Sequence, residues 1–217
     1  MAIPAGAEPS LLDPAIRSEL RSLSKLGADY VGGHLVAAGQ LIDTDPKKAL
    51  EHARAARGRG ARVGAVREAT GLAAYHAGEW AEALSELRAA RRISGDSGNI
   101  AVMADCERAL GRPERALKSL DDPAVRKLDS ATRSELLIVV AGARRDLGQL
   151  DAALAVLERG GLDVKNPKAG SCRLWYAYAD ALEAAGRVAD AVHWFGAAAQ
   201  VDYQDETDAA DRAANLL

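Results

Sequence analysis

Side chains that could bind a metal ion are few in this sequence and lie far apart. None of its histidines has a second histidine or an acid at the i, i+4 spacing of a zinc-binding H-E-x-x-H helix. The two cysteines are widely separated, and neither belongs to a C-x-x-C pair. We therefore expect neither a metal site nor a disulfide framework. The residues concerned are His34, His52, His76, His193, Cys106 and Cys172.

Catalytic motifs are missing as well. Gly58-Arg59-Gly60 is too short to wrap a phosphate, and the Lys-Ser/Thr of a phosphate-binding loop does not follow it. There is no G-x-S-x-G nucleophile motif, and no pair of acids stands out from the many surface acids. We therefore expect a protein that is not an enzyme and that uses no cofactor.

Arginine is the one chemically notable side chain that clusters. From Lys47 to Arg92 the chain has ten Lys or Arg and five Asp or Glu, a local charge of +5. Three interpretations are open: cations that stabilise helix C-termini, a surface for an acidic protein, and a nucleic-acid-binding face over Arg54 to Arg92. The net charge of −3 argues against nucleic acid. The arginines are Arg54, Arg57, Arg59, Arg62, Arg67, Arg88, Arg91 and Arg92.

The composition predicts that helices position these side chains. Apolar residues make up 48% of the chain but aromatic residues only 4%, and alanine accounts for 47 of the 217 residues. Alanine is the best helix former and lets helices approach closely. No basic and apolar leader opens the sequence, and no apolar run approaches the ~20 residues that span a bilayer. We therefore expect an all-helical, soluble, cytoplasmic protein.

A short motif recurs along the chain and explains how the helices pair. Glycine ends one helix, a bulky residue or proline follows two positions later, and an alanine follows five positions later. Glycine permits the left-handed conformation that ends a helix, while the alanine lies where the two helices cross. A large residue comes four positions after the alanine, one helical turn away on the same face. The motif pairs Gly78 with Ala83, Gly111 with Ala116, Gly148 with Ala153 and Gly186 with Ala191, and a looser version ends at Ala49.

These residues resemble the tetratricopeptide repeat (TPR), whose period is 34 residues; the alanines here are spaced by 34, 33, 37 and 38. Small residues at Gly71, Ala104, Ala141 and Ala179, each seven before a turn glycine, also match that repeat. The pattern is similar as well to a TPR group common in high-GC actinobacteria. The resemblance implies an all-α, right-handed superhelical solenoid of antiparallel helix pairs, with about five repeats and a flanking helix at each end.

The expected organisation is a flexible arm over residues 1–10 and a single TPR-like solenoid over 11–217. Its repeats cover about 28–60, 62–95, 97–128, 131–160 and 171–203, with a tail at 204–217. The two longer periods predict inserted residues at 121–130 and 160–170. Other repeats have a second alanine seven positions after the crossing alanine, but here Pro123 and Gly160 stand at that position. The second helices of those two repeats should therefore end early.

The resemblance also implies where a partner binds. In such solenoids the first helices of the repeats line a concave groove. A clamp of Lys, Arg and Asn that grips a chaperone-tail carboxylate in some relatives is absent here, because its positions hold largely Ala101, Asp105, Ile138, Gly142, Tyr176 and Asp180. An extended or helical peptide with apolar anchors is the expected ligand. The predicted groove residues are Glu68, Leu72, Tyr75, His76, Asp105, Arg108, Glu135, Ile138, Arg145, Tyr176 and Asp180.

Six of the nine aromatic residues belong to the last repeat. They are expected to form core, or an exposed terminal patch if the tail leaves them uncovered. The leading hypothesis is therefore a non-enzymatic scaffold that binds a protein segment in the groove or at this patch. The alternatives are a nucleic-acid-binding repeat and a self-assembling structural oligomer. The six aromatics are Trp175, Tyr176, Tyr178, Trp194, Phe195 and Tyr203.

Overall fold

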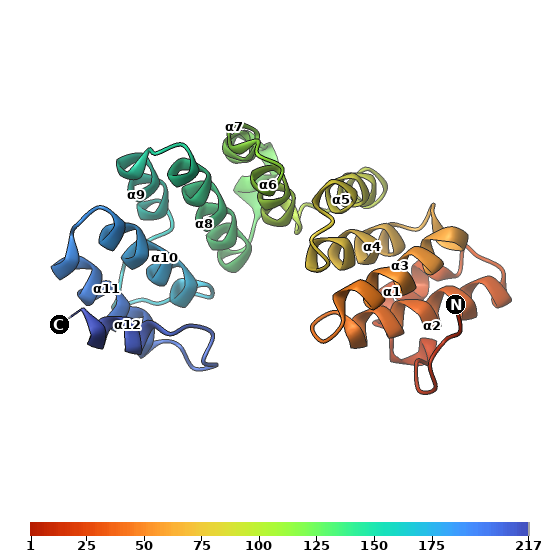
Figure 1. Cartoon of the computed structure of the whole chain (residues 1–217). Helices are drawn as coiled ribbons and strands as arrows, with labels where there is room; N and C mark the ends of the chain where they lie inside the picture. The colour runs from red at the N-terminus through yellow and green to blue at the C-terminus, as the bar shows by residue number, and fades with distance from the viewer. Residues whose placement is uncertain (217) are drawn as a thin grey trace. The chain divides into compact units, whose positions relative to one another are not determined.

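The computed structural model describes residues 1–216, and all its regular elements are helices (Figure 1). The chain divides into two compact units, residues 1–99 and the part from Ile100 onward. Unit 1 contains η1 (Pro9–Leu11), α1 (Pro14–Leu20), α2 (Lys25–Leu41), α3 (Pro46–Gly60), α4 (Gly64–His76) and α5 (Trp80–Ser94). Unit 2 contains α6 (Ile100–Ala109), α7 (Pro113–Leu117), η2 (Lys118–Asp121), η3 (Pro123–Lys127), α8 (Ser130–Asp146), α9 (Leu150–Glu158), α10 (Ser171–Ala184), α11 (Val188–Gln200) and α12 (Ala209–Asn215).

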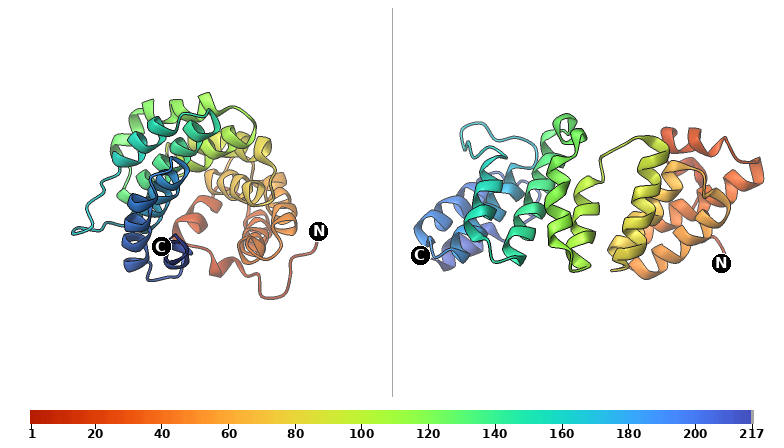
Figure 2. Two further views of the ribbon diagram at one scale, coloured as in Figure 1. Left: turned by 60° about the vertical axis from the view of Figure 1, so that its left-hand side comes forward. Right: turned by 90° about the horizontal axis from the view of Figure 1, so that it is seen from above.

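Within each unit, consecutive helices pair and stack as the motif predicts (Figure 2). The pairs are α2 with α3 and α4 with α5 in unit 1, and α6 with α7, α8 with α9 and α10 with α11 in unit 2. The short helix α12 covers α11 at the end of the stack. Whether the repeats run as one solenoid from unit 1 into unit 2 stays a prediction of the sequence.

The four turn glycines have the left-handed backbone conformation that the motif predicts. Their φ angles are +78°, +71°, +72° and +75° at Gly78, Gly111, Gly148 and Gly186. In each turn the next residue donates its backbone N–H to the carbonyl five residues earlier, over 2.8 to 2.9 Å. This bond satisfies a carbonyl that the end of the first helix would otherwise leave free. The repeated turn therefore fixes how each second helix returns along the first.

The recurring alanines lie at the helix crossings and have no exposed surface. Each of Ala49, Ala83, Ala116, Ala153 and Ala191 is 0% exposed, the looser first one included. The large residue one turn later is buried with it in three of the repeats, as Leu87, Leu157 and Phe195. A longer side chain at the crossing would force the paired helices apart.

The two insertions interrupt the helices where the sequence predicts. The helix α7 has only five residues and continues as the 3-10 turns η2 and η3. The helix α9 ends at Glu158, two residues before Gly160. A Cβ at Gly160 would lie 2.5 Å from Leu174 Cδ2, so a larger residue there would require Leu174 of α10 to move.

The N-terminal residues pack more closely than the predicted flexible arm implies. Residues 1–10 were expected to be a flexible arm, but Ala7 is buried against α2. The pair Gly32-Gly33 of α2 makes room for this segment, because a Cβ at Gly33 would lie 2.9 Å from Ile3 Cδ1. The helix α1 ends at Leu20, and the hydroxyl of Ser24 caps α2 by accepting from Gly27 N.

None of the described helices is both long and apolar enough to cross a membrane.

Candidate functional site

A pocket of about 420 Å³ lies in unit 2 on the first helices of its three pairs, α6, α8 and α10. Ile138, Ala141, Leu157 and Ala177 give it apolar walls. Three arginines and one acid of these helices and two residues of the segment before α12 give it a polar lining, which Gly142 and Tyr176 complete. The six polar residues are Arg108, Arg145, Arg173, Asp180, Glu206 and Thr207. A pocket of this size and mixed lining is typical of a site that binds a side chain or a small ligand.

Arg108 crosses from α6 to α8 along one side of the pocket. Its Nε donates to Asp146 Oδ2 over 2.8 Å, and its Nη1 donates to Asp105 Oδ1 over 3.0 Å. The guanidinium lies directly over Gly142, where a Cβ would be 2.7 Å from Arg108 Cζ. The bond to Asp146 raises the pKa of Arg108, although burial acts in the opposite direction. Gly142 is therefore needed for this arginine to lie flat.

Two further arginine–acid pairs connect α8 to α10. Arg145 Nη1 donates to Asp180, and Arg173 Nε forms an ion pair with Glu135 Oε1 over 2.8 Å. Burial would raise the pKa of Asp180, but its hydrogen bonds with Arg145 and Arg212 outweigh burial and lower it. Burial raises the pKa of Glu135; Arg173 opposes this rise and the Glu206 carboxylate adds to it. These ion pairs hold neighbouring first helices together along the groove.

The ion pairs leave hydrogen-bond donors available. A guanidinium has five N–H groups, but Arg145 uses only Nη1 and Arg173 only Nε within the described residues. The pocket therefore offers free N–H donors beside carboxylate acceptors and an apolar surface. That combination matches a peptide backbone, which also presents both donors and acceptors.

The tail closes one end of this site. Arg212 on α12 donates to Asp180 Oδ1 over 3.0 Å and to Glu183 Oε2 over 2.6 Å, and its guanidinium lies 4.5 Å from the Phe195 ring centroid. Tyr176 accepts from Arg212 over 3.0 Å and donates to Asp208 Oδ1 over 2.7 Å. Burial and the bond to Asp208 raise the pKa of Tyr176.

The predicted groove residues fall into two sets. Arg108, Ile138, Arg145, Tyr176 and Asp180 line the pocket of unit 2, and Asp105 and Glu135 form ion pairs with arginines that line it. The other four lie on α4 of unit 1. There Glu68 accepts from Asn99 over 2.7 Å, Tyr75 contacts the rings of His76 and Trp80, and Leu72 is half-buried.

Sequence reasoning missed several residues of the pocket. Arg173 precedes Tyr176 by three positions, so helical register alone could have placed both on one face. Leu157 comes from a second helix, while Glu206, Thr207 and Arg212 come from the tail. No local pattern in the sequence predicts that the tail folds back onto α10.

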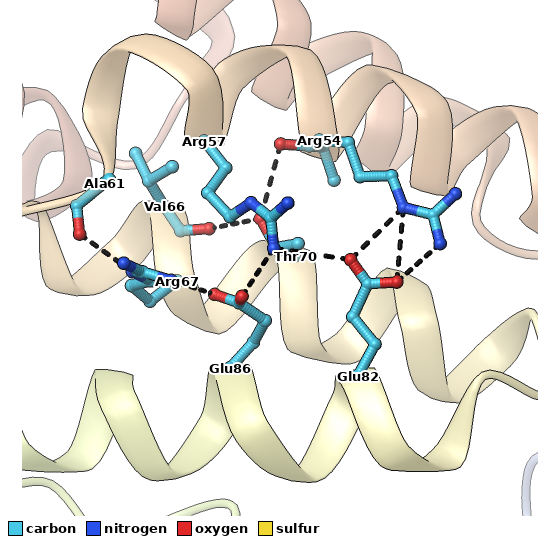
Figure 3. Close-up of polar contacts among 9 residues, drawn as sticks. Arg54, Arg57, Ala61, Val66, Arg67, Thr70, Glu82 and Glu86 are labelled. Atoms are coloured by element: carbon cyan, nitrogen blue, oxygen red, sulfur yellow. Dashed lines mark hydrogen bonds and ion pairs between the residues drawn. The ribbon is translucent and has the colours of Figure 1, made fainter.

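Three arginines of the cluster in unit 1, Arg54, Arg57 and Arg67, form ion pairs with acids of α5 (Figure 3). Glu86, only 4% exposed, accepts from Arg57 Nη1 over 2.6 Å and from Arg67 Nη1 over 2.8 Å. Glu82 accepts from Arg54 Nη2 over 2.5 Å. These acids on α5 compensate arginines of α3 and α4, so the three positive charges stabilise helix packing. A nucleic-acid-binding face over Arg54 to Arg92 stays an alternative prediction of the sequence.

The terminal aromatic patch that the sequence allowed does not form. Trp175, Tyr178 and Phe195 are buried, and Trp194 lies between Trp175 and Tyr178 with ring centroids 5.9 and 5.4 Å away. The tail residues Asp208 and Arg212 engage Tyr176. Of the six aromatic residues, Tyr203 alone is largely exposed, so they do not form a continuous exposed patch.

Two histidines that are distant in sequence meet inside unit 1. His34 Nδ1 and His52 Nδ1 are 2.8 Å apart, and both rings are almost fully buried. Burial is the main reason that the pKa of His34 is lowered, and the neighbouring His52 lowers it further. Burial is also the main reason that the pKa of His52 is lowered, and the charge of Lys48 lowers it further. Within residues 1–216 no third His, Cys, Asp or Glu joins them in a group that could hold a metal ion.

Comparison with known proteins supports the fold. The sequence matches no protein-family model and is similar to no curated protein. The crystal structure of YrrB, described as a TPR protein with an unusual peptide-binding site, matches over 84% of this chain and 91% of the YrrB chain. The TM-score is 0.50 and the sequence identity 18%, so the likeness concerns the fold. The chain therefore has the helical-repeat fold of a TPR-like protein.

Proposed function

We propose that this protein is a non-enzymatic scaffold that binds a peptide segment of a partner protein in the pocket of unit 2. The observation that carries the proposal is the lining of that pocket. Free guanidinium N–H groups of Arg145 and Arg173 and the Glu206 carboxylate adjoin the apolar surface of Ile138 and Ala177. An extended or helical peptide can use all three at once.

Two further points support a peptide rather than an ion as the ligand. Acids and arginines alternate along the groove, so no single sign of charge dominates it. YrrB, which has a similar fold, is described as having a peptide-binding site.

Affinity capture from a native lysate tests the proposal. We would compare the wild type with Ala177→Glu, which places a charge on the apolar wall of the pocket, and with Ala155→Glu, on the exposed face of α9. We expect the wild type and Ala155→Glu to capture the same partner and Ala177→Glu to lose it. Equal capture by all three proteins would exclude this pocket as the binding site.

A further inference from the structure

A second pocket of unit 2 lies at the first insertion in the repeat. It shares no residue with the pocket on α6, α8 and α10, which we call the groove pocket. It has a volume of about 570 Å³ and is formed by η2, η3, α8 and the end of α9. The residues that line it are Leu120, Asp121, Asp122, Pro123, Val125, Arg126, Arg133 and Arg159. The insertion therefore builds a concave surface of its own.

Three exposed arginines, each from a different element, meet at this pocket. Arg126 belongs to η3, Arg133 to the first turn of α8, and Arg159 follows α9. Within the described residues none of them has an ion pair, a hydrogen bond or a ring contact from its side chain.

The other arginines of unit 2 differ from these three. Each of them has a polar side-chain partner. Arg108, for example, pairs with Asp146, and Arg212 pairs with Glu183. The unpaired arginines of the described unit therefore gather at one pocket instead of being scattered over its surface. The paired ones are Arg108, Arg112, Arg115, Arg144, Arg145, Arg173, Arg187 and Arg212.

The charge of the lining favours an anion. Three guanidinium groups face two carboxylates, those of Asp121 and Asp122, which leaves an excess of one positive charge. The Asp122 carboxylate already accepts a hydrogen bond, because its Oδ1 caps η3 by accepting from Ala124 N over 2.9 Å. The fork of N–H groups on a guanidinium matches the oxygens of a carboxylate or a phosphate.

The apolar part of the lining indicates what the anion is attached to. Leu120, Pro123 and Val125 line the same pocket, and its volume is in the range of sites for small organic molecules. We propose that this arginine pocket binds the phosphate or carboxylate group of a small organic molecule. The site is independent of the groove and of the peptide-binding function proposed for it.

Titration with matched probes, followed by NMR of the backbone amides, tests this site. Phenyl phosphate and benzoate present the two oxoanions on the same ring, and phenol is the uncharged control. We expect at least one of the two anions to shift the NMR signals of the amides in η3 and at the start of α8, with a Kd of about 1–10 mM. Binding of phenyl phosphate alone assigns a phosphate, binding of benzoate alone assigns a carboxylate, and phenol should not bind.

Three substitutions and a control decide whether the arginines are responsible. Arg126→Ala, Arg133→Ala and Arg159→Ala change exposed side chains, so each variant should fold like the wild type. We expect each to raise the Kd about tenfold, whereas Arg187→Ala, which removes an exposed arginine on α11's N-cap, should leave it unchanged. Absence of binding by both anions, equal binding of phenol, or unchanged affinity in all three variants would overturn the proposal.

Discussion

The alanine at each helix crossing sets the distance between two paired helices, and the cost of replacing it can be measured within one helix. Ala153 is fully buried on α9, and Ala155 lies on the exposed face of the same helix. Because the crossing has no room for a longer side chain, we expect Ala153→Leu to lower the free energy of unfolding by about 1–3 kcal/mol. Ala155→Leu should change it by less than about 0.5 kcal/mol. Urea denaturation measures both, and equal effects would mean that Ala153 does not set the helix spacing.

The buried histidine pair makes the stability of unit 1 depend on pH. His34 and His52 have lowered pKa values in the folded protein, whereas in the unfolded chain both titrate near their usual pKa of about 6.5. The unfolded chain therefore binds more protons below about pH 6.5, and stability falls as the pH drops through this value. Thermal unfolding at pH 7.5 and 5.5 should show a loss on the order of 1 kcal/mol at the lower pH.

Other charges near the pair affect its titration and need a control. The positive charges of the amino terminus and Arg59 disfavour protonation of His34. The amino terminus and Lys48 disfavour protonation of His52, whereas the negative charge of Glu51 favours protonation of His52. His76 lies exposed in the same unit. We expect His76→Gln to retain the pH dependence of the wild type and His34→Phe/His52→Leu to reduce it. A double variant with undiminished pH dependence would show that other groups cause the acid sensitivity.

Which residues the sequence could predict depends on how local their role is. Gly78 and Ala83 were predictable because a turn and a helix crossing act at fixed spacing along the chain. The contact between His34 and His52 was not, since the residues lie on separate helices and no motif links them. Their position on the buried faces of α2 and α3 gave only the weak signal of polar residues among apolar ones.

At the scale of elements, the carboxylates of α5 link this helix to α3 and α4. Glu86 is buried and binds two arginines, so Glu86→Ala leaves Arg57 and Arg67 without this partner. We expect a loss of about 1–3 kcal/mol in the free energy of unfolding. Glu82 is more exposed and its main partner, Arg54, is 44% exposed, so Glu82→Ala should cost less than about 1 kcal/mol. Urea denaturation would contradict this account if the two variants were equally destabilised.

The tail helix α12 depends on one side chain for its polar contacts with α10. Arg212 binds Asp180, Glu183 and Tyr176 and lies over Phe195. We expect Arg212→Ala to release the tail, so that amides 202–215 exchange with solvent faster while those of α8 keep their protection. Hydrogen exchange measures this directly. Unchanged exchange in the tail would mean that other contacts, such as the hydrogen bond from Tyr176 to Asp208, hold α12.

The helix pairs were predictable as elements, while the connections between them were only partly so. Turn glycines in the sequence marked the ends of the four helices α4, α6, α8 and α10. Pro123 and Gly160 correctly indicated that α7 and α9 end early, but the two 3-10 turns depend on contacts outside their own segment. The docking of residues 1–10 on α2 was also missed, because it depends on the fit of Ile3 against Gly33.

At the scale of the whole molecule, the fold follows from the repetition of one motif, and the candidate site follows from the register of that repetition. Because the first helices stack, residues at equivalent positions meet, which is why five predicted groove residues line one pocket. The repeat could not predict the residues that the tail adds, such as Glu206 and Thr207. Nor could it predict the arginine pocket, which belongs to an insertion that departs from the repeat.

Selection from a random-peptide library on the purified protein tests the central claim most directly, namely that the groove pocket of unit 2 binds peptides. The selected peptides would then be titrated against the wild type, Ala177→Glu and Ala155→Glu. We expect Ala177→Glu to raise the Kd at least about tenfold, equivalent to about 1.4 kcal/mol, and Ala155→Glu to leave it unchanged. No enrichment of any peptide, or equal affinity for all three proteins, would contradict the claim.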